Sequence, residues 1–159
     1  MKKIILLLAM VMTAIGANAQ NTYNVRAGVA YLNEYAAFTT MAQANISLKN
    51  VSLWTYSPAV QFATDGDCKT AMFHFNMGYR IRIGDNCLFV PKMGIAVGYF
   101  SEEEYNQASL VGPSIDLAFE LKRFVIGLTG FYSINQAEEY YENEFYNIPM
   151  LSLTLGYTF

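Results

Sequence analysis

Several residue types that carry chemistry are scarce in this chain of 159 residues. It has two cysteines and one histidine, too few for a disulfide scaffold or a four-thiolate zinc site. Charged residues make up only 14% of the chain, and the formal net charge is −3, so a broad basic surface for nucleic acid is excluded. Hydrophobic residues reach 53% and aromatic residues 15%, which excludes disorder. The length suits a single domain with a sizeable core.

The first 19 residues predict a cleaved secretory signal peptide. Lys2 and Lys3 form a basic start, an apolar run follows from Ile4 to Ile15, and Ala17-Asn18-Ala19 supplies small residues before Gln20. The alternative is a buried N-terminal helix. Crossing a bilayer as a helix takes about 20 apolar residues, so the run is too short to span one comfortably.

Residues 20–159 are predicted to form one barrel domain made of strands. The mature chain would carry eight basic and thirteen acidic residues, a net charge of −5. Apolar residues recur at every second position, which is typical of β-strands. In the last segment Leu151, Leu153 and Leu155 alternate with Ser152 and Thr154. Eight such runs are predicted, at about 22–32, 38–48, 51–62, 69–83, 87–100, 108–121, 124–134 and 147–159.

The predicted connections alternate in length. The short ones are Lys49-Asn50, Gly84-Asp85-Asn86 and Lys122-Arg123, and the longer polar ones are residues 33–37, 63–68, 101–107 and 135–146. Short turns at one end and longer loops at the other are typical of up-and-down outer-membrane barrels. The sequence therefore predicts an all-β fold, an eight-stranded antiparallel transmembrane β-barrel.

Alternation alone does not decide which face is apolar, because a soluble lipocalin-like barrel alternates in the opposite sense. Three features favour an apolar outer face. Seven glycines lie on the polar face, which suits a narrow lumen, and the apolar face of the strands carries no charge. Aromatic residues also gather near strand ends, as bilayer interfaces favour. They form a short-turn belt of Tyr23, Tyr79, Phe89, Phe119, Phe124, Tyr157 and Phe159, and a loop-end belt of Tyr31, Phe38, Phe62, Phe73, Tyr99 and Tyr132. Trp54, Tyr56 and Phe75 are expected nearer the middle.

The signal sequence, the eight amphipathic runs and the terminal Phe159 after alternating Tyr157, Leu155 and Leu153 resemble small outer-membrane β-barrels. The resemblance covers the whole mature chain and points to OmpX/OmpA-type barrels, especially the β-barrel domains of Bacteroidetes cell envelopes. It implies that Tyr157 and Phe159 form the C-terminal signal read by the barrel-assembly machinery.

The polar face carries charges that a narrow barrel would enclose. An eight-stranded barrel is just filled by its side chains, and buried charges must be paired. We therefore predict a lumen ion-pair network in which Asp116 and Glu120 face basic residues. Its members are Arg26, Arg80, Arg82, Lys92, Asp116 and Glu120. A gated polar path through the lumen is the alternative.

His74, the single histidine, falls on the lumen face. We expect a hydrogen-bonded lumen residue. The alternative is a catalytic base, as in the lipid A-modifying outer-membrane enzymes that this barrel resembles in size, but no Ser/His/Asp arrangement can be placed by spacing. The sequence therefore predicts no enzymatic activity, no catalytic residue, no cofactor and no metal.

The outer connections are acidic, with ten of the thirteen acidic residues against one base, Lys69. We expect a solvated rim, although such oxygen ligands could also bridge divalent cations to lipopolysaccharide phosphates. Tyrosine-rich loops favour protein contacts. The predicted interaction residues of the outer loops are Glu102, Glu103, Glu104, Tyr140, Tyr141 and Tyr146.

Together these features predict a monomeric outer-membrane protein with a structural, adhesion or interaction role. Its expected partners are outer-membrane lipid, lipopolysaccharide, the barrel-assembly machinery and an unknown extracellular partner, but no nucleic acid. A lipid A-modifying enzyme and a soluble lipocalin-like binding barrel are the alternatives. Cys68 and Cys87 are predicted to be free, because this threading separates them by about 35 Å along the strands, whereas a disulfide needs Cα atoms within about 7 Å.

Overall fold

A computed structural model describes residues 21–32, 35–47, 53–66, 68–102, 106–134, 137–138, 145–146 and 148–159. The predicted signal peptide lies outside this part of the chain. The principal strands are β1 (Thr22–Leu32), β2 (Tyr35–Ser47), β3 (Trp54–Thr64), β4 (Cys68–Tyr79), β5 (Ile81–Gly84), β6 (Cys87–Glu102), β7 (Asn106–Leu121), β8 (Phe124–Tyr132) and β11 (Pro149–Thr158). The two-residue strands β9 (Ala137–Glu138) and β10 (Phe145–Tyr146) pair only with each other.

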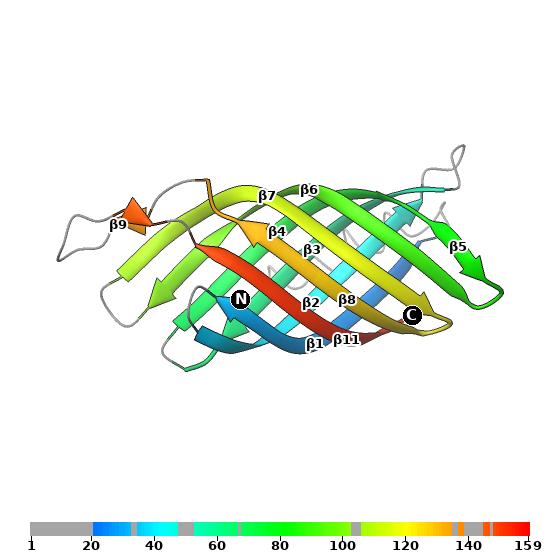
Figure 1. Ribbon diagram of the computed structural model, residues 1–159, viewed down its shortest axis with the longest axis horizontal. Coiled ribbons are helices and arrows are strands. Elements are labelled where there is room, and N and C mark those ends of the chain that lie inside the picture. The colour runs from blue at the N-terminus through cyan, green and yellow to red at the C-terminus, as the bar shows by residue number, and fades with distance from the viewer. Residues whose placement is uncertain are drawn as a thin grey trace, which may run out of the picture.

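The sheet closes on itself into a barrel (Figure 1). Its strand order is β4-β3-β2-β1-β11-β8-β7-β6-β5, and β4 also pairs with β6. β4 and β5 make up one strand of the barrel, which is interrupted at Arg80, where the backbone N–H donates to the Leu53 carbonyl at 2.7 Å. Every pairing is antiparallel. The predicted fold, an eight-stranded antiparallel barrel, is confirmed.

Burial alternates along the strands in the predicted sense. In β11, Leu151, Leu153 and Leu155 are 54–65% exposed on the outer face, whereas Ser152 and Thr154 are fully buried. The lumen of a soluble lipocalin-like barrel would instead be apolar along its length. The polar residues enclosed here exclude that alternative. Among the residues that the structure describes, no helix is long and apolar enough to cross a membrane.

Aromatic rings meet in pairs at the short-turn end of the barrel. Ring centroids lie 6.0 Å apart for Phe124 and Tyr157 and 5.1 Å apart for Tyr157 and Phe159. Trp54 packs edge-on against Tyr79 at 5.5 Å. Its expected position nearer the middle is therefore wrong, because β3 begins at Trp54 and its first residue belongs to this belt. Residues of the loop-end belt are 40–59% exposed on the outer face: Tyr31, Phe38, Phe62, Phe73, Tyr99 and Tyr132.

The strands run further toward the loop end than predicted. The first connection shortens to residues 33–34, since Leu32 pairs with Tyr35, and the pairing of Glu102 with Asn106 leaves 103–105 as the third. Backbone hydrogen bonds extend a ladder through polar residues as well as apolar ones. Among these connections only the one between β8 and β11 is long. At the other end, the predicted turn Lys49-Asn50 lies outside the described residues.

Cys68 and Cys87 lie at opposite ends of the barrel and form no disulfide with each other, as predicted. Cys68 pairs with Glu102 at the loop end, while Cys87 pairs with Leu121 and Gly84 at the short-turn end. This register supports the predicted threading.

Candidate functional site in the barrel lumen

A fully buried carboxylate, Asp116 on β7, forms ion pairs with two buried cations in the lumen, Arg26 and Lys92. Arg26 on β1 binds it with two parallel hydrogen bonds, Nη1 to Oδ1 and Nη2 to Oδ2, both at 2.8 Å. Lys92 Nζ on β6 donates to Oδ2 at 2.7 Å. Gln43 Nε2 and Thr129 Oγ1 complete the set at 3.0 and 3.1 Å. We call these five residues the Asp116 hub.

Neighbouring amides satisfy the remaining polar atoms of the hub. Gln43 Oε1 accepts hydrogen bonds from Lys92 Nζ at 2.9 Å and from Arg26 Nη2. Arg26 Nε donates to Asn24 Oδ1 at 2.9 Å. The guanidinium is therefore bonded through all three nitrogens, although Arg26 is 0% exposed. Buried ion pairs persist when hydrogen bonds complete them in this way.

Two glycines make room for the arginine of the hub. A Cβ atom at Gly127 would lie 2.1 Å from Arg26 Nη1, and one at Gly156 would lie 2.7 Å from Arg26 Cγ. Both glycines belong to the polar face seen in the sequence. Because neither glycine has a side chain, the Arg26 side chain can lie flat against β8 and β11.

The structure brings together Arg26, Lys92 and Asp116 of the predicted network and leaves its other members apart. Glu120 accepts a long hydrogen bond of 3.4 Å from Asn45 Nδ2 instead of an ion pair. Arg80 is half-buried and its Nη2 donates to Thr22 Oγ1 at 3.3 Å. Arg82 is exposed at the short-turn end.

Arg82 and Arg80 depart from the prediction for a geometric reason. Both residues keep the lumen parity, since β5 continues the register of β4 against β6 and Arg82 pairs with Leu88. They lie further toward the short-turn end than Asp116, where Arg80 reaches Thr22 and Arg82 is exposed. Sequence reasoning also missed the hub's uncharged members Gln43 and Thr129 and their neighbour Asn24. The one available signal was that these residues fall on the polar face of their strands.

His74 lies in the lumen and is hydrogen-bonded through Nδ1 to Ser114 Oγ at 2.8 Å. The two residues are 40 positions apart in the chain, which is why spacing did not reveal the pair. His74 is 0% exposed and Ser114 is 1% exposed. Among the described residues, His74 Nε2 has no hydrogen-bond partner. The pair therefore has neither a third group on the imidazole nor an open approach from the outer face.

Apolar side chains fill the lumen near the loop end, against the rule that lumen residues are polar. This loop-end cluster is almost completely buried, with exposed fractions of 0–4%. Its large members are Leu32, Cys68, Met72, Phe100, Leu110, Phe131, Ile148 and Met150. A smaller cluster of Leu88, Val90, Ala118 and Val125 lies at the other end. The loop end of the lumen is therefore apolar, and the polar hub lies between the loop-end cluster and the smaller one.

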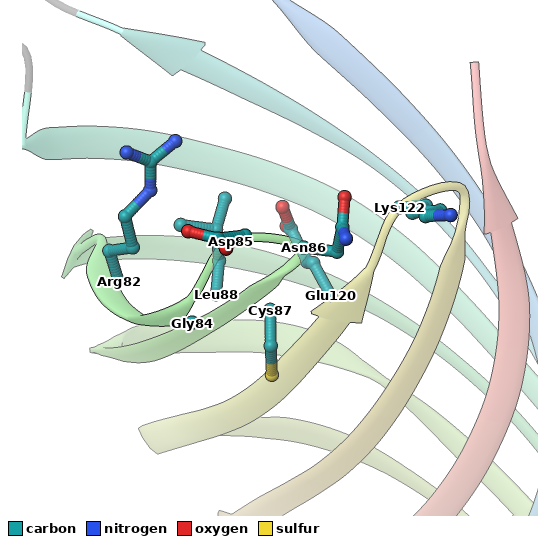
Figure 2. A pocket seen from close by; sticks show the side chains of 8 residues that line it. All are labelled: Arg82, Gly84, Asp85, Asn86, Cys87, Leu88, Glu120 and Lys122. Carbon is teal, nitrogen blue, oxygen red and sulfur yellow. The ribbon is translucent and has the colours of Figure 1, made fainter.

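A pocket of about 210 Å³ opens at the short-turn end, between the β5–β6 hairpin and the β7–β8 turn (Figure 2). Its lining includes Arg82, Asp85, Asn86, Leu88, Glu120 and Lys122. Within the described residues, no group of three or more histidine, cysteine, aspartate or glutamate side chains could hold a metal ion. The predicted outer-loop residues Glu103, Glu104, Tyr140 and Tyr141 lie outside those residues, as do the side chains of Glu102 and Tyr146.

No protein-family model matches the chain, and no curated protein is similar to it in sequence. Solved structures do match its fold. Neisserial surface protein A has a TM-score of 0.60 at 8% identity, with 87% of this chain and 94% of that chain covered. The N-terminal β-barrel domain of Pseudomonas aeruginosa OprF has a TM-score of 0.56 at 11% identity, with 89% and 100% covered.

A third similar structure is the outer-membrane enzyme PagL, with a TM-score of 0.54 at 15% identity and with 85% of this chain and 97% of that chain covered. At these identities the likeness concerns the fold. The chain therefore has the fold of the small outer-membrane β-barrels.

Proposed function

We propose that this protein is a small, non-enzymatic β-barrel of the bacterial outer membrane with a structural, adhesion or interaction role. The observation that carries the proposal is the outer surface of the barrel. Between the two aromatic belts, no outward side chain of the described strands is charged, and leucines such as Leu153 and Leu155 are about 60% exposed. An apolar band flanked by aromatic girdles matches a bilayer and is costly in water.

Cell fractionation with a gel-mobility assay tests the location. We expect the protein in the outer-membrane fraction, and we expect the unheated sample to migrate differently from the boiled one, because a membrane barrel resists detergent until it is heated. Recovery of the protein in a soluble fraction, with one mobility before and after boiling, would contradict the proposal.

The outer connections are the proposed route to a partner. Their acidic and tyrosine-rich composition supports contacts with an extracellular protein. Lipopolysaccharide would surround the barrel as a second partner. Deletion of residues 137–145 should abolish adhesion or partner capture while the barrel remains heat-modifiable. An unchanged binding phenotype would argue against a role for this connection. Tyr157 and Phe159 would serve recognition by the barrel-assembly machinery, and the barrel would act as a monomer.

A lipid A-modifying enzyme is the second candidate, favoured by the His74–Ser114 hydrogen bond. The complete burial of both residues supports a structural role instead. Lipid A extracted from cells that express the His74→Ala variant should therefore equal lipid A from cells with the unaltered protein. A mass shift in lipid A that depends on His74 would instead support the enzyme.

A further inference from the structure

The pocket at the short-turn end lies at the opposite end of the barrel from the outer connections and has no part in the proposed function. Figure 2 shows Arg82 and Lys122 on opposite sides of this pocket, with Glu120 and Asn86 between them. The Cys87 thiol points away from the other labelled side chains.

Glu120 forms the buried wall of the pocket. It is 7% exposed, and among the described residues its carboxylate accepts one hydrogen bond, from Asn45 at 3.4 Å, with no ion pair. On the lumen face one residue pair, Val90 and Ala118, lies between it and the pair Lys92 and Asp116. Lys92 acts on Glu120 only at longer range, and a largely buried carboxylate that no cation contacts directly is unfavourable. The pocket therefore favours a positively charged group beside Glu120.

The rim of the pocket favours a negatively charged group instead. Arg82 and Lys122 are exposed there, and neither forms an ion pair with a described acidic residue. Asp85 adds a carboxylate on the hairpin, so the lining carries two charges of each sign. A ligand with one charge would meet repulsion from part of this lining, whereas a ligand with both charges can satisfy the wall and the rim together.

Lys122 has a backbone conformation that suits glycine better. Its φ of 56° makes it the one non-glycine residue with positive φ in the described part of the chain, at the first position of a two-residue turn. Its N–H donates to the Asn86 carbonyl at 3.1 Å, which ties the two walls of the pocket together. The favoured two-residue hairpin turns require a positive φ at this position, where glycine is the least strained residue. A glycine would relieve this strain but would remove the ammonium group from the rim.

We propose that this pocket binds a small zwitterion, a molecule in which an ammonium group lies a few bonds from a carboxylate or a phosphate. The ammonium group faces Glu120, and the anionic group faces Lys122 at one side of the rim, with Arg82 at the opposite side. A volume of about 210 Å³ equals the share of roughly seven water molecules in the liquid, at about 30 Å³ each. The pocket therefore suits a ligand the size of an amino acid or of phosphoethanolamine.

Isothermal titration calorimetry on the refolded barrel in detergent micelles tests the proposal. The probes are glycine and phosphoethanolamine, with ethylamine and inorganic phosphate as matched ligands of one charge each. At least one zwitterion should bind saturably and at least tenfold more tightly than either single-charge probe. Preference between the two zwitterions identifies the anionic group as a carboxylate or a phosphate. The absence of saturable binding by both zwitterions would refute the proposal.

Three variants localise the binding, each verified as folded by its heat-dependent gel mobility. Glu120→Gln should weaken binding at least tenfold, whereas Lys69→Gln, which removes an exposed charge at the other end of the barrel, should leave it unchanged. Lys122→Gly should bind more weakly yet resist urea better, because the strain is relieved. Equal affinity in Glu120→Gln and the unaltered chain would overturn the assignment. Because the titration is done in micelles, its failure is distinguishable from failure of the fractionation experiment.

Discussion

Asp116 is the residue on which the lumen depends most. It neutralises two buried cations, Arg26 and Lys92, at distances of 2.7–2.8 Å. Loss of one member of a buried ion pair leaves the other charge uncompensated, whereas replacement of all members by apolar residues is often tolerated. The charges of the hub are therefore interdependent, and the effects of substituting them singly and jointly should differ in sign or size.

Asp116→Ala should lower the free energy of unfolding by about 3–5 kcal/mol, because Arg26 and Lys92 remain buried without a carboxylate. Urea unfolding in lipid vesicles measures the effect. The matched control is the joint replacement of Arg26 and Lys92 by Met and of Asp116 by Leu, which should unfold near the urea concentration of the unaltered chain. A small loss in the single variant would mean that water reaches the hub.

Gly127→Ala tests the space beside the Arg26 guanidinium. A methyl group there would lie 2.1 Å from Arg26 Nη1, and overpacking of this kind costs about 1–3 kcal/mol. Gly130→Ala is the control on the same strand, since the nearest atom to its Cβ is Leu151 Cδ1 at 4.0 Å. Urea midpoints should fall for Gly127→Ala and stay unchanged for Gly130→Ala. Equal midpoints for the two variants would show that the guanidinium moves freely.

At the scale of one strand, β11 shows how alternation produces a two-sided surface. Its serine and threonine side chains point into the lumen, where Ser152 receives a hydrogen bond from Gln61 Nε2 at 3.0 Å. Its leucines cover the outer face. β11 also closes the barrel by pairing with β1, so each of its faces is fixed by neighbours on both sides.

Leu153→Arg tests whether lipid or water contacts the outer face of β11. Arginine at the bilayer midplane costs about 2–4 kcal/mol, falling to about 0–1 kcal/mol near the interface. The control is Ile134→Arg, at a residue that is 67% exposed just beyond the end of β8. Urea unfolding in lipid vesicles should show a loss for Leu153→Arg and little change for Ile134→Arg. Equal stability of both variants would place the face in water.

At the scale of the whole molecule, the content of the lumen changes along the length of the barrel. The loop-end cluster occupies the lumen beside the outer connections, the Asp116 hub lies in the middle, and the pocket opens at the short-turn end. Eight strands leave an interior that side chains can fill completely. An ion on the gated polar path would therefore have to cross the apolar loop-end cluster.

Planar-bilayer recordings should show no large steady conductance for the reconstituted barrel, because the loop-end cluster and the hub fill the lumen. A wider porin of 16 strands, recorded in the same lipid, is the positive control. Sustained openings that scale with the amount of inserted protein would favour the gated path over a structural lumen.

The sequence alone determined the strand alternation, the apolar outer face and most of the two belts, because side chains of a β-strand alternate with a period of two residues. It also singled out Arg26, Lys92 and Asp116 as lumen charges. Which of the charges meet depended on the register across β1, β6 and β7, and register is a long-range property that composition does not encode.

The tertiary structure therefore decided three features. It left Glu120 bonded to Asn45 and outside the Asp116 hub, exposed Arg82 at the short-turn end, and joined His74 to Ser114 across 40 residues of chain. It also placed the loop-end cluster inside the lumen, where the period of two residues still holds but the polarity rule does not. Alternation fixes which side a residue faces, whereas the packing inside a closed barrel determines which chemistry that side requires.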